Sequence, residues 1–141
     1  MTTRSTFLIA LFATAAPLAA QTAAKTFNKA FNTDGQSVIT LDLPGTIDIK
    51  VWDNPTVRIE ISVSLPSGNN AMLNELATVG RYNLVAKSTL TRMLITAPNM
   101  AKQVRVKGET IKETLTFVVF VPKDVKIEMH NTEVLADTKK E

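Results

Sequence analysis

The sequence predicts an all-β fold, mainly an antiparallel β-sandwich or two-layer sheet, with one short helix near residues 70–79. Three observations support this class. Residues 41–65 alternate apolar and polar side chains with a period of two, as half-buried strands do. Only residues 71–79 space their apolar residues as a helix does. The 141 residues are 45% hydrophobic and 21% charged, which is enough apolar material for one folded domain and argues against disorder.

The alternating stretch contains two strands. Residues 47–51 place isoleucine and valine on one face, and residues 57–63 repeat the pattern after a turn at residues 53–55. Two alternating segments joined by a short Asn-Pro turn are typical of an antiparallel hairpin.

Charge favours one register for this hairpin. If Val51 lies opposite Ile59, Lys50 lies opposite Glu60 and apolar side chains face each other. Cross-strand pairs of opposite charge contribute about 0.2–1 kcal/mol each, so we expect this register.

Further strands are expected where alternation resumes between turn signals. The helix over residues 71–79 should begin at Asn69 or Asn70 as N-cap and end at Gly80. The remaining expected strands are residues 26–31, 38–43, 82–86, 90–97, 103–107, 115–121 and 125–129.

The strand over residues 115–121 differs because Val118 and Phe120 make its second face apolar too. A strand that is apolar on both faces is usually covered on both, and the helix is the expected second cover. The predicted core consists of Ile47, Ile49, Val51, Ile59, Ile61, Leu84, Leu115, Phe117 and Val119.

The N-terminus has the layout of a secretory signal peptide over residues 1–20. A positive start with Arg4 precedes an apolar run at residues 7–16, and then a proline and small residues follow. Cleavage after Ala20 or after Ala24 would leave one β-rich domain over residues 26–135 and a polar tail at residues 136–141. We therefore expect an exported chain, in a periplasm or at a cell surface, with no transmembrane segment after cleavage.

Three motifs combine strands with turns, and they are Gly45-x-Ile47-x-Ile49-x-x-Trp52-Asp53-x-Pro55-x-Val57, Tyr82-x-Leu84 and Val119-x-Val121-Pro122-x-x-Val125. Together they resemble a family of exported bacterial proteins classed as adhesins of unknown specific function. The resemblance covers roughly residues 27–129, and it implies a β-solenoid-type domain. This chain would be a short member that lacks most of the solenoid, so a truncated β-solenoid is an alternative form of the all-β fold. The family contributes no catalytic residues.

The sequence offers little for catalysis or for metal binding. It contains no cysteine and one histidine, His130, which stands in no recognisable motif. Its glycines lie apart at turns and form no phosphate loop. Loss of Arg4 lowers the formal net charge from +3 to about +2, so nucleic acid is not an expected partner. We expect no catalytic residue, no metal and no cofactor.

Four residues are candidates for binding a partner: Trp52, Arg58, Lys126 and Glu128. Trp52 falls on the polar face of its strand, where the ring is free to stack on a ligand, anchor an interface or pack over Arg58. Lys126 and Glu128 lie on a strand at residues 125–129 that has no obvious successor. Its edge either pairs with a second chain or is protected by these charges and by the charged tail at residues 139–141.

The expected function is a non-catalytic exported β domain that binds a protein or a cell-envelope component. Two alternatives remain: an envelope hydrolase that acts through carboxylates, and a structural subunit that pairs through an edge strand.

Overall fold

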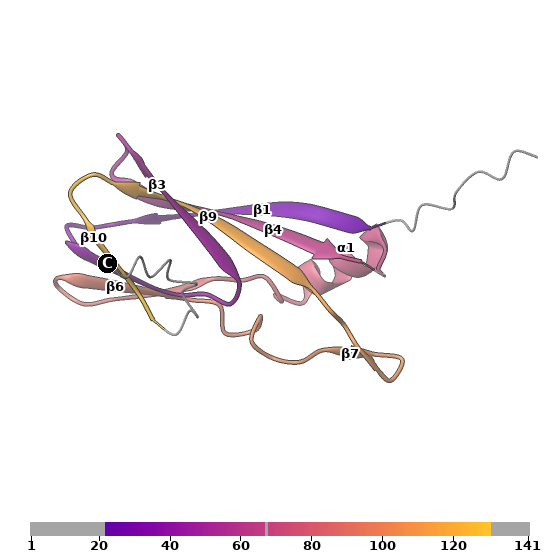
Figure 1. The fold of residues 1–141 in the computed structure, drawn as a ribbon. Coiled ribbons are helices and arrows are strands. Elements are labelled where there is room, and N and C mark those ends of the chain that lie inside the picture. Colours follow the sequence, from indigo (N-terminus) through magenta and orange to yellow (C-terminus); the bar gives the residue numbers. More distant parts are fainter. Residues whose placement is uncertain (1–21, 67, 131–141) are drawn as a thin grey trace, which may run out of the picture.

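A computed structural model describes residues 22–66 and 68–130, and in this part of the chain two four-stranded sheets form two layers (Figure 1). Sheet A has the strand order β1-β4-β9-β3, and sheet B has the order β10-β2-β6-β5. A small ribbon, β7-β8, and a single helix, α1, complete the described fold. The predicted all-β, two-layer architecture with one short helix is confirmed.

The elements follow the sequence pattern closely. They are β1 (Ala23–Asn32), β2 (Val38–Asp42), β3 (Thr46–Trp52), β4 (Thr56–Leu65), α1 (Asn70–Thr78), β5 (Val85–Ser88), β6 (Arg92–Thr96), β7 (Arg105–Val106), β8 (Glu109–Thr110), β9 (Thr114–Pro122) and β10 (Lys126–Met129). Two strands start three residues away from the predicted positions: β1 starts earlier, and β5 starts later than the alternation around Leu84 predicts.

The predicted hairpin is wrong, although both of its strands exist. Strand β9 lies between β3 and β4, antiparallel to β4 and parallel to β3. Val51 therefore pairs with Val121, and Ile59 pairs with Val119. A strand that is apolar on both faces gains more by lying inside a sheet than at its edge, and β9 is the most apolar strand of sheet A. Strand β2 is also parallel to β6 and β10, so both sheets are mixed.

Two similar corners carry the chain between the layers. Pro44-Gly45 leads from β2 in sheet B to β3 in sheet A, and Pro122-Lys123 leads from β9 in sheet A to β10 in sheet B. Gly45 has φ of +122°, and a Cβ on it would lie 2.5 Å from the carbonyl oxygen of Leu115. Only glycine fits this first corner, because the backbone is left-handed there and β9 passes close by.

The two sheets enclose one hydrophobic core. Ile59, Ile61, Phe117 and Val119 of sheet A are fully buried, and Leu84 is 8% exposed, as predicted. The prediction is wrong for Val51, which is 63% exposed. Strand β3 is the edge of sheet A, so only one neighbouring strand shields its inward side chains. Ile47 and Ile49 on the same strand are half-buried for this reason. Leu115 is half-buried as well, since it lies on β9 just before the pairing with β3 begins.

Helix α1 begins as predicted, since the Asn69 side chain accepts a hydrogen bond from the Met72 backbone N–H at 2.8 Å. It buries Leu73 and Leu76 and packs beside β1, where Lys25 Nζ donates to its Asn74 side chain at 2.7 Å. The sequence predicted that the helix would cover the outer face of β9, and this prediction is wrong. Nearby aromatic and cationic side chains cover the outer face of β9 instead.

Several sequence predictions fall outside the described residues. They are the signal peptide over residues 1–20, the end of the β-rich domain at residues 131–135 and the tail at residues 136–141.

Candidate functional site

Two of the four candidate residues meet on the outer face of sheet A. Arg58 lies opposite Phe120 in the sheet, with its guanidinium carbon 4.3 Å from the Phe120 ring centroid and 5.2 Å from that of Trp52. Trp52 also donates its indole N–H to the Thr56 carbonyl oxygen at 2.8 Å. Trp52 and Arg58 thus pack together, although they come from strands that are not neighbours.

Arg58 has a further partner, since Nη2 donates to Glu60 Oε1 at 2.6 Å. Lys50 extends the cluster with its Nζ 5.9 Å from the Phe120 centroid. Cation–π contacts at such half-exposed positions contribute about 0.5–1 kcal/mol each. Because the indole N–H and one face of the ring are engaged within the chain, this cluster covers β9 rather than offering a free stacking platform.

The other two candidates lie on the outer face of sheet B. Glu128 accepts hydrogen bonds from Arg92 and forms an ion pair with Lys126 at 3.3 Å. The bond from Arg92, supported by Lys126, holds the pKa of Glu128 below its usual range. Arg92 also donates to the Thr40 hydroxyl at 3.1 Å, so Glu128, Thr40 and Arg92 form a polar ladder across β10, β2 and β6. The four candidate residues therefore form two separate clusters on opposite layers.

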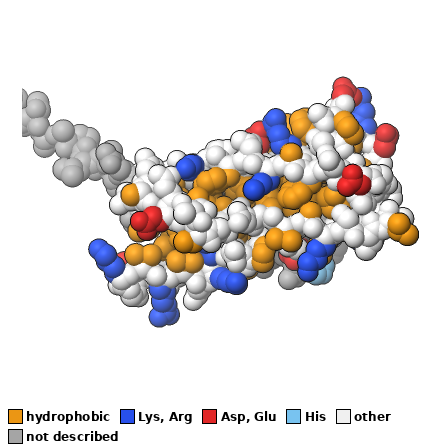
Figure 2. Space-filling model, turned by 180° about the vertical axis from the view of Figure 1, so that it is seen from behind, with side chains coloured by type: hydrophobic (Ala, Val, Ile, Leu, Met, Phe, Trp, Pro, Cys, Tyr) orange, Lys and Arg blue, Asp and Glu red, His pale blue; other side chains and the backbone are white. Residues whose placement is uncertain are grey.

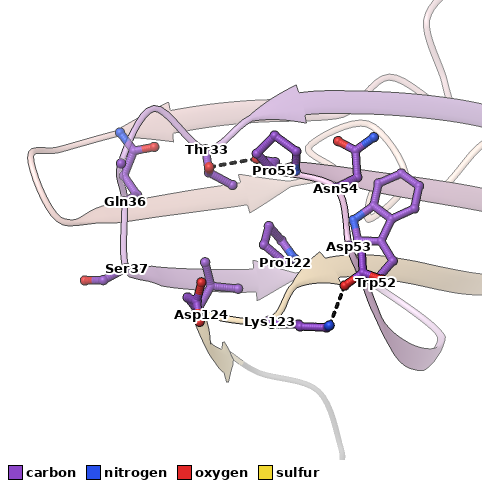
Figure 3. Close-up of a pocket in the computed structure, with 12 residues that line it drawn as sticks. Thr33, Gln36, Ser37, Trp52, Asp53, Asn54, Pro55, Pro122, Lys123 and Asp124 are labelled. Carbon is purple, nitrogen blue, oxygen red and sulfur yellow. Dashed lines mark hydrogen bonds and ion pairs between the residues drawn. The ribbon is translucent and has the colours of Figure 1, made fainter.

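An end groove lies where three loops meet, and it has a volume of about 490 Å³ (Figure 3). The loops join β1 to β2, β3 to β4 and β9 to β10, and an ion pair between Asp53 and Lys123 links the last two. Thr33 ties the first two together by donating to the Pro55 carbonyl oxygen at 2.8 Å. Gln36 is 8% exposed at this groove, and its Oε1 has no hydrogen-bond partner among the described residues.

The two carboxylates of the groove are exposed to solvent. Asp53 has 84% of its side chain exposed and is paired with Lys123, and Asp124 is exposed as well. A carboxylic acid that donates a proton at neutral pH needs a site from which water is excluded, and neither residue has one. Within the described residues no group of three or more His, Cys, Asp or Glu could hold a metal ion.

One flank of the sandwich is left open at the edges of both sheets. Strand β3 is one edge of sheet A, and β10 is one edge of sheet B. Their inward side chains are all apolar and remain partly exposed, with Val51 63% and Met129 41% exposed. We call this surface the open flank; it consists of Ile47, Ile49, Val51, Ile127 and Met129.

The opposite flank carries charge on its edge strand. Edge strand β1 turns Lys25 and Lys29 toward the core side, opposite Val63 and Ile59, and inward lysines discourage strand pairing. Phe27 stacks on Tyr82 with centroids 5.0 Å apart, which brings β1 together with the segment that leads into β5. Figure 2, a view from behind Figure 1, shows hydrophobic side chains interspersed with lysine and arginine side chains. The open flank has no inward charge of this kind.

A buried polar cluster escaped the sequence reasoning. Arg81 is 9% exposed and donates to Glu113 Oε1 at 3.0 Å and to the Lys102 carbonyl oxygen at 2.6 Å. Burial, and next the negative charge of Glu113, raise the pKa of the neighbouring Tyr82 to about 12. No sequence motif marks these residues. The arginine binds the loop before β7 to the turn after α1, which is a structural role.

No family model, curated protein or solved structure matches this chain. Helix α1, the one helix in residues 22–66 and 68–130, is not long and apolar enough to cross a membrane.

Proposed function

We propose that this chain is a non-catalytic, exported β domain that binds a protein or cell-envelope partner through its open flank. The observation that carries the proposal is the contrast between the two flanks. One has inward lysines on its edge strand and helix α1 beside it, whereas the other exposes inward apolar side chains on both edge strands. Exposed apolar edges of this kind are typical of surfaces that recruit another strand.

The backbone of β10 supports the same proposal. The Lys126 N–H donates to the Ser37 carbonyl oxygen at 2.8 Å, and the His130 N–H donates to the Leu41 carbonyl oxygen at 2.9 Å. Hydrogen-bonding groups alternate between the two sides of a strand, so the N–H groups of Ile127 and Met129 are directed away from β2. A partner strand would find these donors in place.

The resemblance to exported adhesin-like proteins is part of the proposal. A β-solenoid stacks parallel strands, and the parallel pairs β2-β10 and β3-β9 are of that kind. The pairs end at the open flank, where a solenoid would add its next strands. In this interpretation the chain is a short member of the family, and the partner supplies the missing strands.

Export is proposed from the leader sequence, and the fold favours one of the two cleavage positions. Cleavage after Ala24 would remove the first two residues of β1, where Ala23 is 5% exposed and pairs with Leu65. Cleavage after Ala20 would leave β1 whole.

A cross-linking experiment tests the proposal. A photo-reactive residue at Val51 should capture an envelope component, while the same residue at Leu90, which is 95% exposed at the β5–β6 turn, should not. Met129→Pro removes one outward N–H and should abolish the capture, whereas Met129→Ala should retain it. Lys126→Pro is a poorer probe, because the Lys126 N–H bonds Ser37 and the change would leave both outward donors in place. Equal capture from both positions, or capture that survives Met129→Pro, would contradict the proposal.

A further inference from the structure

Strand β3 of the open flank has an unusual symmetry in its charges. Asp48 and Lys50 are exposed on its outer face and stand one residue either side of Ile49. Ile47 and Val51 stand two residues either side of Ile49 and face inward. Positions at equal distances from Ile49 therefore match in kind. The two positions one residue away carry opposite charges, and the two positions two residues away are apolar.

We propose that a second copy of this chain occupies the open flank, with β3 pairing antiparallel to its own counterpart about a twofold axis at Ile49. The inference rests on the proposed function, because it names the occupant of the surface proposed there to bind a partner. In this register Asp48 of each copy lies opposite Lys50 of the other, and Ile47 lies opposite Val51. An isologous interface repeats each contact twice, so two Asp–Lys pairs form.

The neighbouring registers are worse. An axis at Asp48 sets two aspartates opposite each other, and an axis at Lys50 does the same with two lysines. Like charges directly opposite each other destabilise a strand pair. An axis between two residues would place apolar side chains opposite polar ones, because side chains alternate between the faces of a sheet. Of the registers centred on residues 48 to 50, only the one at Ile49 is therefore self-complementary in charge.

The same rotation covers the apolar side chains that the isolated chain leaves exposed. Val51, at 63% exposure, would pack against Ile47 of the second copy, and sheet A would continue across the axis. Strand β10 lies on the same flank, because β2 leads into β3 and β9 leads into β10 through short corners. The rotation therefore brings the two β10 edges toward each other, with Met129 of both copies turned toward the joined core.

Charge reversal tests the register directly. Asp48→Lys sets lysine against Lys50 in both symmetric contacts and should weaken the dimer about 10- to 100-fold, measured by light scattering across a dilution series. Lys50→Asp should weaken it equally. The double variant Asp48→Lys with Lys50→Asp restores opposite charges and should dimerise like the wild type. Both side chains are exposed, so circular dichroism and the melting temperature should change little.

Mixing the two single variants gives the sharpest result. A chain with lysine at both positions and a chain with aspartate at both positions should form a heterodimer, although neither dimerises well alone. Val51→Ser should weaken the dimer. Leu90→Ser should not, because Leu90 is an exposed leucine at the β5–β6 turn, outside the open flank.

Three results would overturn the inference. They are a monomer at every concentration, a single charge variant that dimerises as tightly as the wild type, and a photo-reactive residue at Val51 that links only to residues 131–141 of its own chain. A monomer that still captures an envelope component through the open flank would remove the second copy and leave the proposed function standing. A dimer that follows the charge pattern but captures no envelope component would confirm the second copy and contradict an envelope partner at the open flank.

Discussion

Replacement of Phe117 by alanine tests whether the two sheets share one core. Phe117 is fully buried in β9, between Ile47 of β3 and Ile61 of β4, and it is the largest side chain with no exposed surface. Truncation of a buried phenylalanine removes its contacts and leaves a cavity, at a cost of about 3–5 kcal/mol. A domain of this size is stable by about 5–15 kcal/mol, so the variant should lose about a fifth or more of its stability.

Urea denaturation gives the free energy of unfolding, and the melting temperature should fall by roughly 15 °C or more. Phe120→Ala is the matched control, because Phe120 lies on the same strand but on the half-buried outer face. If Phe117→Ala costs no more than Phe120→Ala, the side chain does not lie in the core, and the assignment of inner and outer faces in sheet A fails.

Three further predictions follow from single contacts. Gly45→Ala should lower the free energy of unfolding by about 1–3 kcal/mol in thermal or urea denaturation, because its Cβ would meet the Leu115 carbonyl oxygen. Gly35→Ala is the control, since its Cβ would meet no atom and the change should cost less. Equal losses would argue against a tight corner at Gly45. Asn69→Ala removes the N-cap of α1 and should cost about 0.5–2 kcal/mol, and an unchanged urea midpoint would contradict the cap. Burial raises the pKa of Tyr82 to about 12 from 10.0, so its contribution to stability is complete below pH 10 and is lost as the pH rises toward 12. Tyr82→Phe should flatten that part of the pH dependence, and a wild-type slope in the variant would rule Tyr82 out as its source.

The surroundings of the four candidate residues were harder to predict than the fold. One expectation was that Trp52 packs over Arg58, and the two side chains do meet. They meet beside Phe120, which belongs to β9, a strand some sixty residues later in the chain. Lys126 and Glu128 were expected at an edge strand, and β10 is an edge. Only one of the two edge strands of the open flank was predicted. The edge at β10 was expected, but nothing in the residues around β3 indicates that β3 is an edge.

By itself the sequence determined what depends on neighbours along the chain. Period-two alternation specified the strands, and the Asn69 cap and Gly80 delimited α1, because backbone conformation and capping bonds are set within a few residues. The tertiary structure alone decided which strands pair. Strand β9, being apolar on both faces, took the place beside β3 that the hairpin would have given to β4, and this left Val51 exposed. Pairing partners are chosen by the burial available in the whole sheet, and that quantity is not written in any single stretch of residues.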